Sequence, residues 1–170
     1  MDTTGLLDSY GRMLLDLLQE DARLPFSDLG RRIGLSPTAT AERLRQMQEA
    51  GIIRRYSVDI DREALGLHMF AFVRITCDGP NYGKFLEFVR NTEEIRECHH
   101  LTGSDAFLLK VITTCIADLE ALIEALLPYG TPTTSIVYSS PVENRRFGVN
   151  SKLTSFSAKK PPIRRNRGIR

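Results

Sequence analysis

A sharp turn centred on Gly34 and Leu35, with a helix signal on either side, is the feature that most restricts how this chain can fold. On its N-terminal side, Ser27 can cap a short helix over residues 28–33. Gly34 then provides a residue that tolerates positive φ, as a sharp turn requires. On its C-terminal side, Ser36-Pro37 places a capping serine before a proline at the first helical position. The helix that starts there runs to about Ala50, so the pattern predicts a helix-turn-helix.

The helix after the turn divides into two faces. Ala41, Leu44 and Met47 share one stripe, which should pack on the short helix and on an amphipathic helix predicted over residues 6–19. The opposite arc mixes small, amide and arginine side chains, which suit entry into the major groove of DNA. Arginine reads guanine edges and also pairs with phosphate, so the sequence leaves the task of each arginine on this arc open. We predict DNA contacts, with the helix cap included, at Ser36, Thr38, Ala39, Glu42, Arg43, Arg45 and Gln46.

Residues 52–58 (IIRRYSV) follow Gly51 and predict a short β-ribbon or wing, with Arg54 and Arg55 placed for contacts with the DNA backbone. Residues 27–56 hold six arginines against three acidic residues, whereas residues 1–150 as a whole hold 16 basic and 21 acidic residues. A positive region in a negative body is expected of a phosphate-binding surface. A solvated face of mixed charge, or a small helical domain that binds protein, remains an alternative.

The second half of the chain predicts a βαββαβ order. Strand-like runs occur at residues 69–77, 95–101, 106–114 and 133–140, and helical patterns at residues 82–91 and 116–127. This order is typical of an α+β ferredoxin-like sandwich, in which helices cover one face of a four-stranded antiparallel sheet. The other face needs a partner, and we expect a second copy of the chain to cover it.

Several classes of protein are disfavoured. No apolar run reaches the length of a membrane span, so we expect no membrane partner, and the N-terminus lacks the pattern of a signal peptide. Three widely spaced cysteines favour reduced thiols and a cytoplasmic location. No metal-ligand spacing, nucleophile–base pair or phosphate-binding glycine loop is evident, so we expect no catalytic residue, no metal and no cofactor. His99 and His100 are neighbours in a predicted strand, so they should point to opposite faces of the sheet.

Three ordered motifs resemble the leucine-responsive regulatory protein / AsnC (Lrp/AsnC, feast/famine) family of transcriptional regulators. They are LGRRIGLSPT with ERLR and EAGIIRRY at residues 29–56, IRECHHLTG with FLLKV at residues 95–111, and TTSIVYSSPV at residues 133–142. The resemblance covers about Leu7 to Val149. It implies a winged helix-turn-helix joined to an ACT-like domain that pairs sheet to sheet and builds larger rings. Its departures are Gly11, where the family usually has a carboxylate, and the turn after the second strand.

In the family this turn contacts an amino-acid effector, and its commonest form has acids at the positions of Ser104 and Ala106. Here Asp105 stands between them and Gly103 matches. A carboxylate and exposed turn N–H groups could hold the ammonium and the carboxylate of an amino acid; a plain β-turn is the alternative. The predicted effector residues are Thr102, Gly103, Ser104, Asp105, Thr133, Thr134 and Ser135.

We therefore expect a winged helix-turn-helix at residues 1–58, a linker at 59–68, an effector-binding and oligomerisation domain at 69–150, and a basic disordered tail at 151–170. The tail carries seven basic and no acidic side chains, and it could either add a nonspecific grip on DNA or only keep the chain in solution. The expected function is sequence-specific DNA binding by a homo-oligomer controlled by an amino acid or related metabolite. An effector-independent architectural DNA-binding protein is one alternative. A second is an enzyme similar to the sirohaem decarboxylases, which share the AsnC-like fold.

Overall fold

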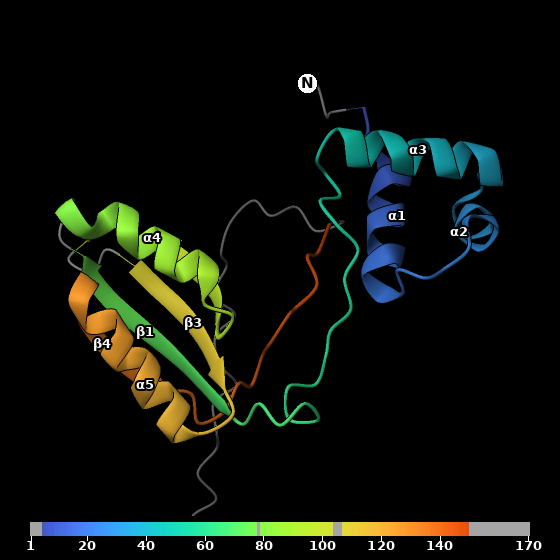
Figure 1. Ribbon diagram of the computed structural model, residues 1–170. Coiled ribbons are helices and arrows are strands. Elements are labelled where there is room, and N and C mark those ends of the chain that lie inside the picture. The colour runs from blue at the N-terminus through green and yellow to red at the C-terminus, as the bar shows by residue number, and fades with distance from the viewer. Residues whose placement is uncertain (1–4, 78, 104–106, 150–170) are drawn as a thin grey trace, which may run out of the picture. The chain divides into compact units, whose positions relative to one another are not determined.

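The computed structural model describes residues 5–77, 79–103 and 107–149, which divide into two units. Residues 5–57 and 144–149 form a helical unit, and residues 58–143 form an α/β unit (Figure 1). The basic tail predicted at residues 151–170 lies outside the described residues. No described helix is long and apolar enough to cross a membrane.

Three helices build the first unit: α1 (Ser9–Glu20), α2 (Phe26–Ile33) and α3 (Pro37–Glu49). Gly34 ends α2 with φ 78°, as the turn predicts, and α3 begins at Pro37 behind its Ser36 cap. The predicted start of α2 is two residues too late, because the carbonyl of Pro25 accepts hydrogen bonds from the N–H groups of Asp28 and Leu29, both at 3.0 Å. The helices enclose a buried apolar cluster of Leu14, Leu29, Ile33, Leu44 and Met47. The helix-turn-helix is confirmed.

The segment after α3 corrects one prediction. Residues 52–58 were expected to form a β-ribbon or wing, but no strand is assigned between α3 and β1. A strand needs a neighbouring extended segment to share its hydrogen bonds, and none of the sheet pairings among the described residues includes this segment. Ile52 and Ile53 instead pack against the apolar cluster of the helices.

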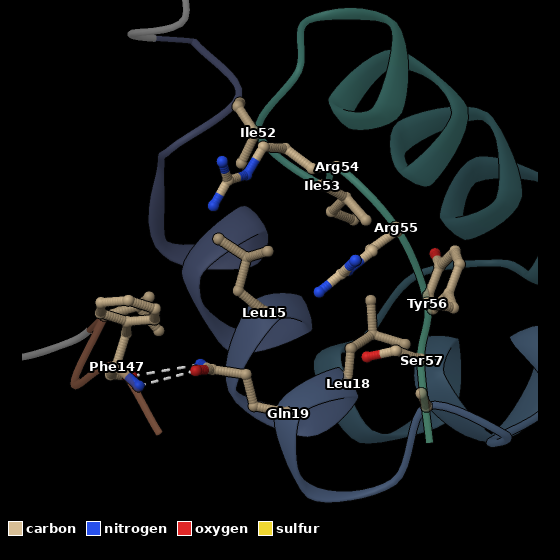
Figure 2. Close-up of a pocket in the computed structure, with 12 residues that line it drawn as sticks. Leu15, Leu18, Gln19, Ile52, Ile53, Arg54, Arg55, Tyr56, Ser57 and Phe147 are labelled. Atoms are coloured by element: carbon tan, nitrogen blue, oxygen red, sulfur yellow. Dashed lines mark hydrogen bonds between the residues drawn. The ribbon is translucent and has the colours of Figure 1, made fainter. Parts of the chain in front are cut away.

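Residues 144–149 return to the helical unit. The side-chain amide of Gln19 donates to the carbonyl of Phe147 at 3.1 Å and accepts from its N–H at 2.7 Å (Figure 2). Arg12, also on α1, donates to the carbonyl of Val149 at 2.6 Å. The sequence pattern assigns these residues to the second domain. Their main-chain hydrogen bonds attach them to α1, and such long-range contacts leave no periodic signal.

The α/β unit contains β1 (Met69–Cys77), α4 (Tyr82–Asn91), β2 (Ile95–His100), β3 (Phe107–Thr113), α5 (Ile116–Leu126) and β4 (Gly130–Ile136), with short 3-10 turns at Gly79–Asn81 and Leu127–Tyr129. The strands lie in the order β2-β3-β1-β4, and every neighbouring pair is antiparallel. This is the predicted ferredoxin-like arrangement. The predicted range 133–140 for the last strand is wrong, because β4 pairs with β1 from Gly130, opposite Cys77, to Ile136, opposite Ala71. Pro132 is tolerated because β4 is an edge strand.

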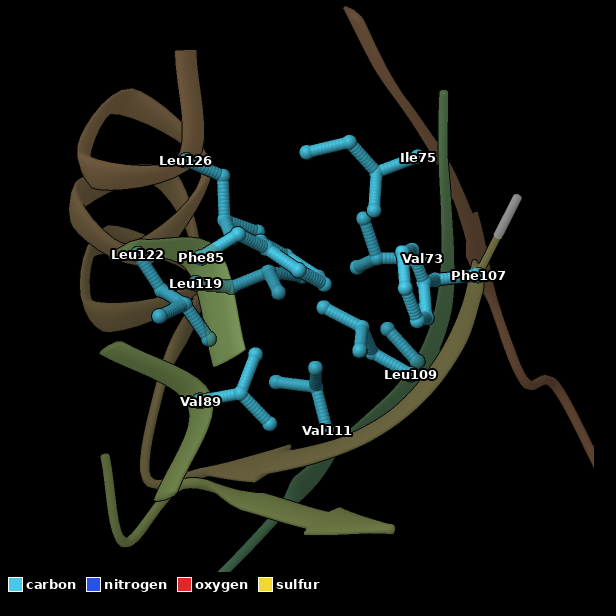
Figure 3. Packing of buried hydrophobic residues seen from close by; sticks show 11 residues of the cluster. Val73, Ile75, Phe85, Val89, Phe107, Leu109, Val111, Leu119, Leu122 and Leu126 are labelled. Carbon is cyan, nitrogen blue, oxygen red and sulfur yellow. The ribbon is translucent and has the colours of Figure 1, made fainter. Parts of the chain in front are cut away.

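One face of the sheet packs against α4 and α5. Figure 3 shows Val73 and Ile75 of β1 and Leu109 and Val111 of β3 directed toward the helices. They meet side chains of α4 and α5 that are also buried, namely Phe85, Val89, Leu119, Leu122 and Leu126. Because side chains alternate along a strand, Phe72, Leu108 and Ile112 lie half-buried on the opposite face. Glu97 and Lys110 form an ion pair at 3.1 Å on that same face. No helix of this unit covers that face (Figure 1).

Candidate nucleic-acid interface and ligand site

Close contact between α2 and α3 fixes the helix-turn-helix. A Cβ atom at Gly30 would lie 2.5 Å from the carbonyl oxygen of Leu35 and 2.8 Å from Oγ1 of Thr40, so only glycine fits. Thr40 is fully buried, and its hydroxyl donates to the carbonyl of Ser36 at 2.9 Å. The hydroxyl of Ser36 in turn accepts from the N–H of Ala39 at 3.2 Å. These contacts hold the first turn of α3 against α2.

The opposite side of α3 is exposed, as the sequence predicts. Thr40, Leu44 and Met47 are buried, so they define the inner face of the helix. Six of the seven residues predicted to contact DNA at α3 or its cap are exposed: Ser36, Thr38, Ala39, Glu42, Arg45 and Gln46. An exposed arc that begins at a helix N-terminus with small side chains can enter a major groove.

The charged residues of this arc pair with one another. Arg45 donates to Glu42 at 2.6 and 2.9 Å and also forms an ion pair with Glu49. Gln46 donates to the same Glu42 carboxylate at 2.8 Å. The hydrogen bonds from Arg45 and Gln46 lower the pKa of Glu42 to about 2, and Glu42 raises the pKa of Arg45. Arg45 therefore has to leave two carboxylates before it can bind a phosphate or a base.

Arg43 does not share this exposed arc. Its side chain is 20% exposed, against 55% for Arg45, and it pairs with the carboxylate of Asp8 at the start of α1. It also donates to the carbonyl of Gly5 at 3.2 Å. The structure thus separates two arginines that the sequence pattern groups together.

Arg54 and Arg55 lie beside α1. Both line a cavity of about 950 Å³ whose walls include Leu15, Leu18 and Ile53, and Figure 2 shows both side chains extending toward α1. Among the described residues, neither has an ion pair. Contact of both side chains with the DNA backbone stays a prediction.

Arg32 is a further exposed arginine near the turn, and it is not among the residues predicted above to contact DNA. This residue is exposed in the last turn of α2, close to the turn at Gly34, and within the described residues it has no ion pair. The local excess of arginine over residues 27–56 is the signal that could have found it.

The predicted effector residues occupy two places in the sheet. Thr102 and Gly103 are exposed directly after β2, and Gly103 has φ 115°, which favours glycine. Ser104 and Asp105 lie outside the described residues. Thr133, Thr134 and Ser135 lie in β4, where Thr133 and Ser135 are exposed and Thr134 faces the other way, half-buried. Because β2 and β4 are opposite edges of the sheet, three strand spacings of about 14 Å in total separate the two groups. One chain does not bring them together.

The two histidines of β2 have different surroundings. His99 lies on the open face and its ring contacts Glu97 at 3.0 Å, while the ring of His100 stacks on buried Phe107 at 4.8 Å between centroids. The two rings thus lie on opposite faces, as predicted. No cluster of histidine, cysteine, aspartate or glutamate with the makings of a metal site occurs in the part of the chain that the structure describes.

Comparison with known proteins agrees with the two-part fold. The AsnC-type helix-turn-helix domain matches residues 7–48, and the Lrp/AsnC ligand binding domain matches residues 70–147. The chain is 30% identical over 133 residues to the HTH-type transcriptional regulator LrpC of Bacillus subtilis, covering 78% of this chain and 92% of LrpC.

Solved structures are similar over most of the chain. A transcriptional regulator of Neisseria meningitidis in complex with L-Met is 27% identical, with a TM-score of 0.79 over 84% of this chain and 97% of that one. The feast or famine regulatory protein of M. tuberculosis complexed with L-methionine is 28% identical, with a TM-score of 0.75 over 83% of this chain and 98% of that one. The chain belongs to the Lrp/AsnC family of transcriptional regulators.

Proposed function

We propose that this chain regulates transcription by binding double-stranded DNA with α3, as a homo-oligomer whose DNA binding responds to an amino acid or a related metabolite. The observation that carries the proposal is the exposed arc of α3, which starts at the Ser36 cap and is held in place by the contact at Gly30. A cytoplasmic location is part of the same proposal, since the protein has to reach DNA. We propose no enzymatic role, because the relatives are named as regulators.

The small residues at the start of the arc are proposed to approach base edges. Thr38 and Ala39 occupy the first turn of α3, where a recognition helix contacts bases, and Gln46 lies on the same exposed side. An amide such as that of Gln46 can pair with adenine in the major groove. Arg45 would exchange its carboxylate partners for phosphate, while Arg54 and Arg55 remain predicted backbone contacts.

This assignment is tested by alanine substitution on one helix. A labelled duplex, selected by the wild-type chain from a random-sequence pool, is titrated with variants and followed by fluorescence anisotropy. Gln46→Ala should weaken binding by about tenfold, the value of one good base contact. The matched control is Gln48→Ala, an exposed glutamine of α3 outside the proposed arc, which should bind like wild type. Equal affinities for the two variants would contradict the assignment.

The effector site is proposed at the turn after β2. Support comes from the match to the Lrp/AsnC ligand binding domain and from the two relatives solved with L-methionine. The N–H groups of the turn would hold the carboxylate of the amino acid, and Asp105 its ammonium group. A second copy of the chain would bring other polar side chains to the turn, because Thr133 and Ser135 of the same chain lie at the far edge of the sheet. The uncovered sheet face is the proposed contact between copies.

Titration of L-methionine and the other amino acids tests this proposal, with operator binding and sedimentation as the two readouts. We expect at least one amino acid to change the affinity or the oligomeric state, and Asp105→Asn to abolish that response while leaving binding without effector unchanged. No response to any of them would favour the architectural alternative. Deletion of residues 151–170 tests the tail separately, since loss of phosphate contacts would reduce the salt dependence of binding.

A further inference from the structure

The chain segment that leads into α1 packs directly against Gly11. Gly11 is buried, and a Cβ atom there would lie 1.8 Å from the carbonyl oxygen of Leu6. Any other residue at position 11 would therefore displace residues 5–8. Arg12 adds a second attachment, because its Nε donates to the carbonyl of Leu7 at 2.8 Å. This entry segment (residues 5–8) is thus held at a fixed place on the first turn of α1.

Arg43 links the entry segment to α3. The carboxylate of Asp8 accepts from the N–H of Gly11 at 2.9 Å, which caps α1, and the same carboxylate forms the ion pair with Arg43. The hydrogen bond from Gly11 and the bond and charge of Arg43 hold the pKa of Asp8 below its ordinary value. Asp8 therefore joins the start of α1 to the middle of α3 through one ionised side chain.

Much of the guanidinium of Arg43 is engaged or buried within the helical unit. One terminal nitrogen donates to Gly5 and pairs with Asp8, and the Nε atom is buried without a hydrogen-bond partner among the described residues. Arg45, two residues later, is the more exposed arginine and lies on the arc that faces away from the helical core. Two arginines of one helix thus have different surroundings, which suits different tasks.

We propose that Arg43 is a positioning residue: by pairing with Asp8 it sets the orientation of α3, and it does not contact DNA. The proposal rests on the proposed function, since it assigns a role within DNA binding. A rotation or shift of α3 about the turn at Gly34 would move Thr38 and Gln46 together, so loss of the ion pair should weaken several base contacts at once.

A double-mutant cycle tests the coupling between the two side chains. The variants of the full chain are Arg43→Gln, Asp8→Asn and the pair combined, titrated against the selected duplex at several salt concentrations. Asparagine also caps helices, so Asp8→Asn keeps the start of α1. Each single variant should bind about tenfold more weakly, and the double variant no more weakly than the single ones. The slope of log K against log salt should stay at the wild-type value in all three.

A direct contact of Arg43 with phosphate would give a different result. The magnitude of the salt slope for Arg43→Gln would then fall by about 0.9. Asp8→Asn would bind DNA as well as wild type or better, because it removes a negative charge. Either outcome overturns the proposal. Arg45→Gln serves as the contrasting variant. The magnitude of its salt slope should fall, and its effect on DNA affinity should add to that of Asp8→Asn.

Folding and function are separated by two further measurements. Thermal unfolding followed by circular dichroism shows whether Arg43→Gln is folded; if it is not, Arg43→Lys replaces it in the cycle. Lysine keeps the positive charge but lacks the forked N–H donors of a guanidinium. Arg43→Lys should therefore bind DNA more tightly than Arg43→Gln, and only while Asp8 is present. Recovery in the Asp8→Asn background as well would overturn the proposal. Failure of the wild-type chain to select any duplex would instead refute the proposed function.

Discussion

Arg45 and Glu42 face each other across one turn of α3 with two hydrogen bonds, of 2.9 and 2.6 Å, between the guanidinium and both carboxylate oxygens. This pair lies on the exposed arc. In the protein without DNA, Arg45, which we propose to bind phosphate, is therefore already paired with a carboxylate. Binding to DNA then exchanges one anionic partner of Arg45 for another. Carboxylates on this arc also repel the phosphate backbone, so they select against loose binding to any DNA.

Glu42→Gln should therefore tighten DNA binding, by about fivefold at most, because an exposed ion pair of this kind contributes little and its loss leaves Arg45 freer for phosphate. Fluorescence anisotropy at low salt measures the change, and part of it should disappear at high salt. Glu20→Gln, the same change at the exposed end of α1, should leave affinity near the wild-type value. Weaker binding by Glu42→Gln would show that the carboxylate itself contacts the DNA.

Gly30→Ala should destabilise the helical unit. The added methyl group meets backbone and a buried hydroxyl at less than 3 Å, so α2 and α3 have to separate, at a cost of about 1–3 kcal/mol. Gly83→Ala in α4 is the matched control, because apart from its chain neighbours and the adjacent backbone of its own helix no atom lies within 4 Å of its Cβ position. Alanine there should be neutral or slightly stabilising. Urea unfolding measures both. A wild-type midpoint for Gly30→Ala would contradict the close packing.

Glu97 should make the stability of the α/β unit depend on pH in the acid range. Hydrogen bonds from His99 and then Lys110 lower the pKa of its carboxyl below the ordinary 4.5. A carboxyl whose pKa is depressed by folding stabilises the fold above its unfolded pKa, and this contribution is lost as the pH falls through the folded pKa. Glu97→Gln should lower the free energy of unfolding at pH 7 by up to about 0.5 kcal/mol, since the pair is partly exposed.

The difference between wild type and Glu97→Gln should shrink as the pH falls below 4.5. Urea titrations at a series of pH values measure it. A difference that stays constant from pH 7 into the acid range would show that the carboxylate charge is not responsible.

Gln19→Ala should release Phe147 from α1. The N–H of Phe147 donates to the Gln19 side chain at 2.7 Å, so its exchange with solvent deuterium should accelerate, by about tenfold for the loss of one hydrogen bond. Hydrogen exchange followed by mass spectrometry measures this. Glu20→Gln again serves as the control, and unchanged exchange in Gln19→Ala would contradict the attachment.

Local signals explain which parts of the fold were predictable. The turn at Gly34 and the start of α3 at Ser36-Pro37 depend on residues next to one another, and the alternation in β1 gave its bounds, Met69–Cys77, without error. The predicted wing and the predicted bounds of the last strand were wrong because a strand also depends on its neighbour. Residues 52–58 have no paired neighbour among the described residues, and β4 takes its register from β1.

The site shows the same division. Helical periodicity separates the buried face of α3 from the exposed one, but it cannot detect that Arg43 meets Asp8, which lies 35 positions earlier in the chain. The sequence therefore supports the arc as a whole while leaving the roles of its arginines to be assigned from contacts.

The hydrogen bonds between Gln19 and Phe147 can form only after residue 147 has been synthesised. The three helices can pack as soon as residue 57 has left the ribosome, because their apolar cluster lies within residues 14–47. Phe147 and Val149 are made only after the whole α/β unit. Until then, one terminal nitrogen of Arg12 and the side-chain amide of Gln19 lack these partners. Domains generally fold in the order in which they emerge. The helical unit is therefore synthesised first but receives its last hydrogen bonds after the α/β unit has been made.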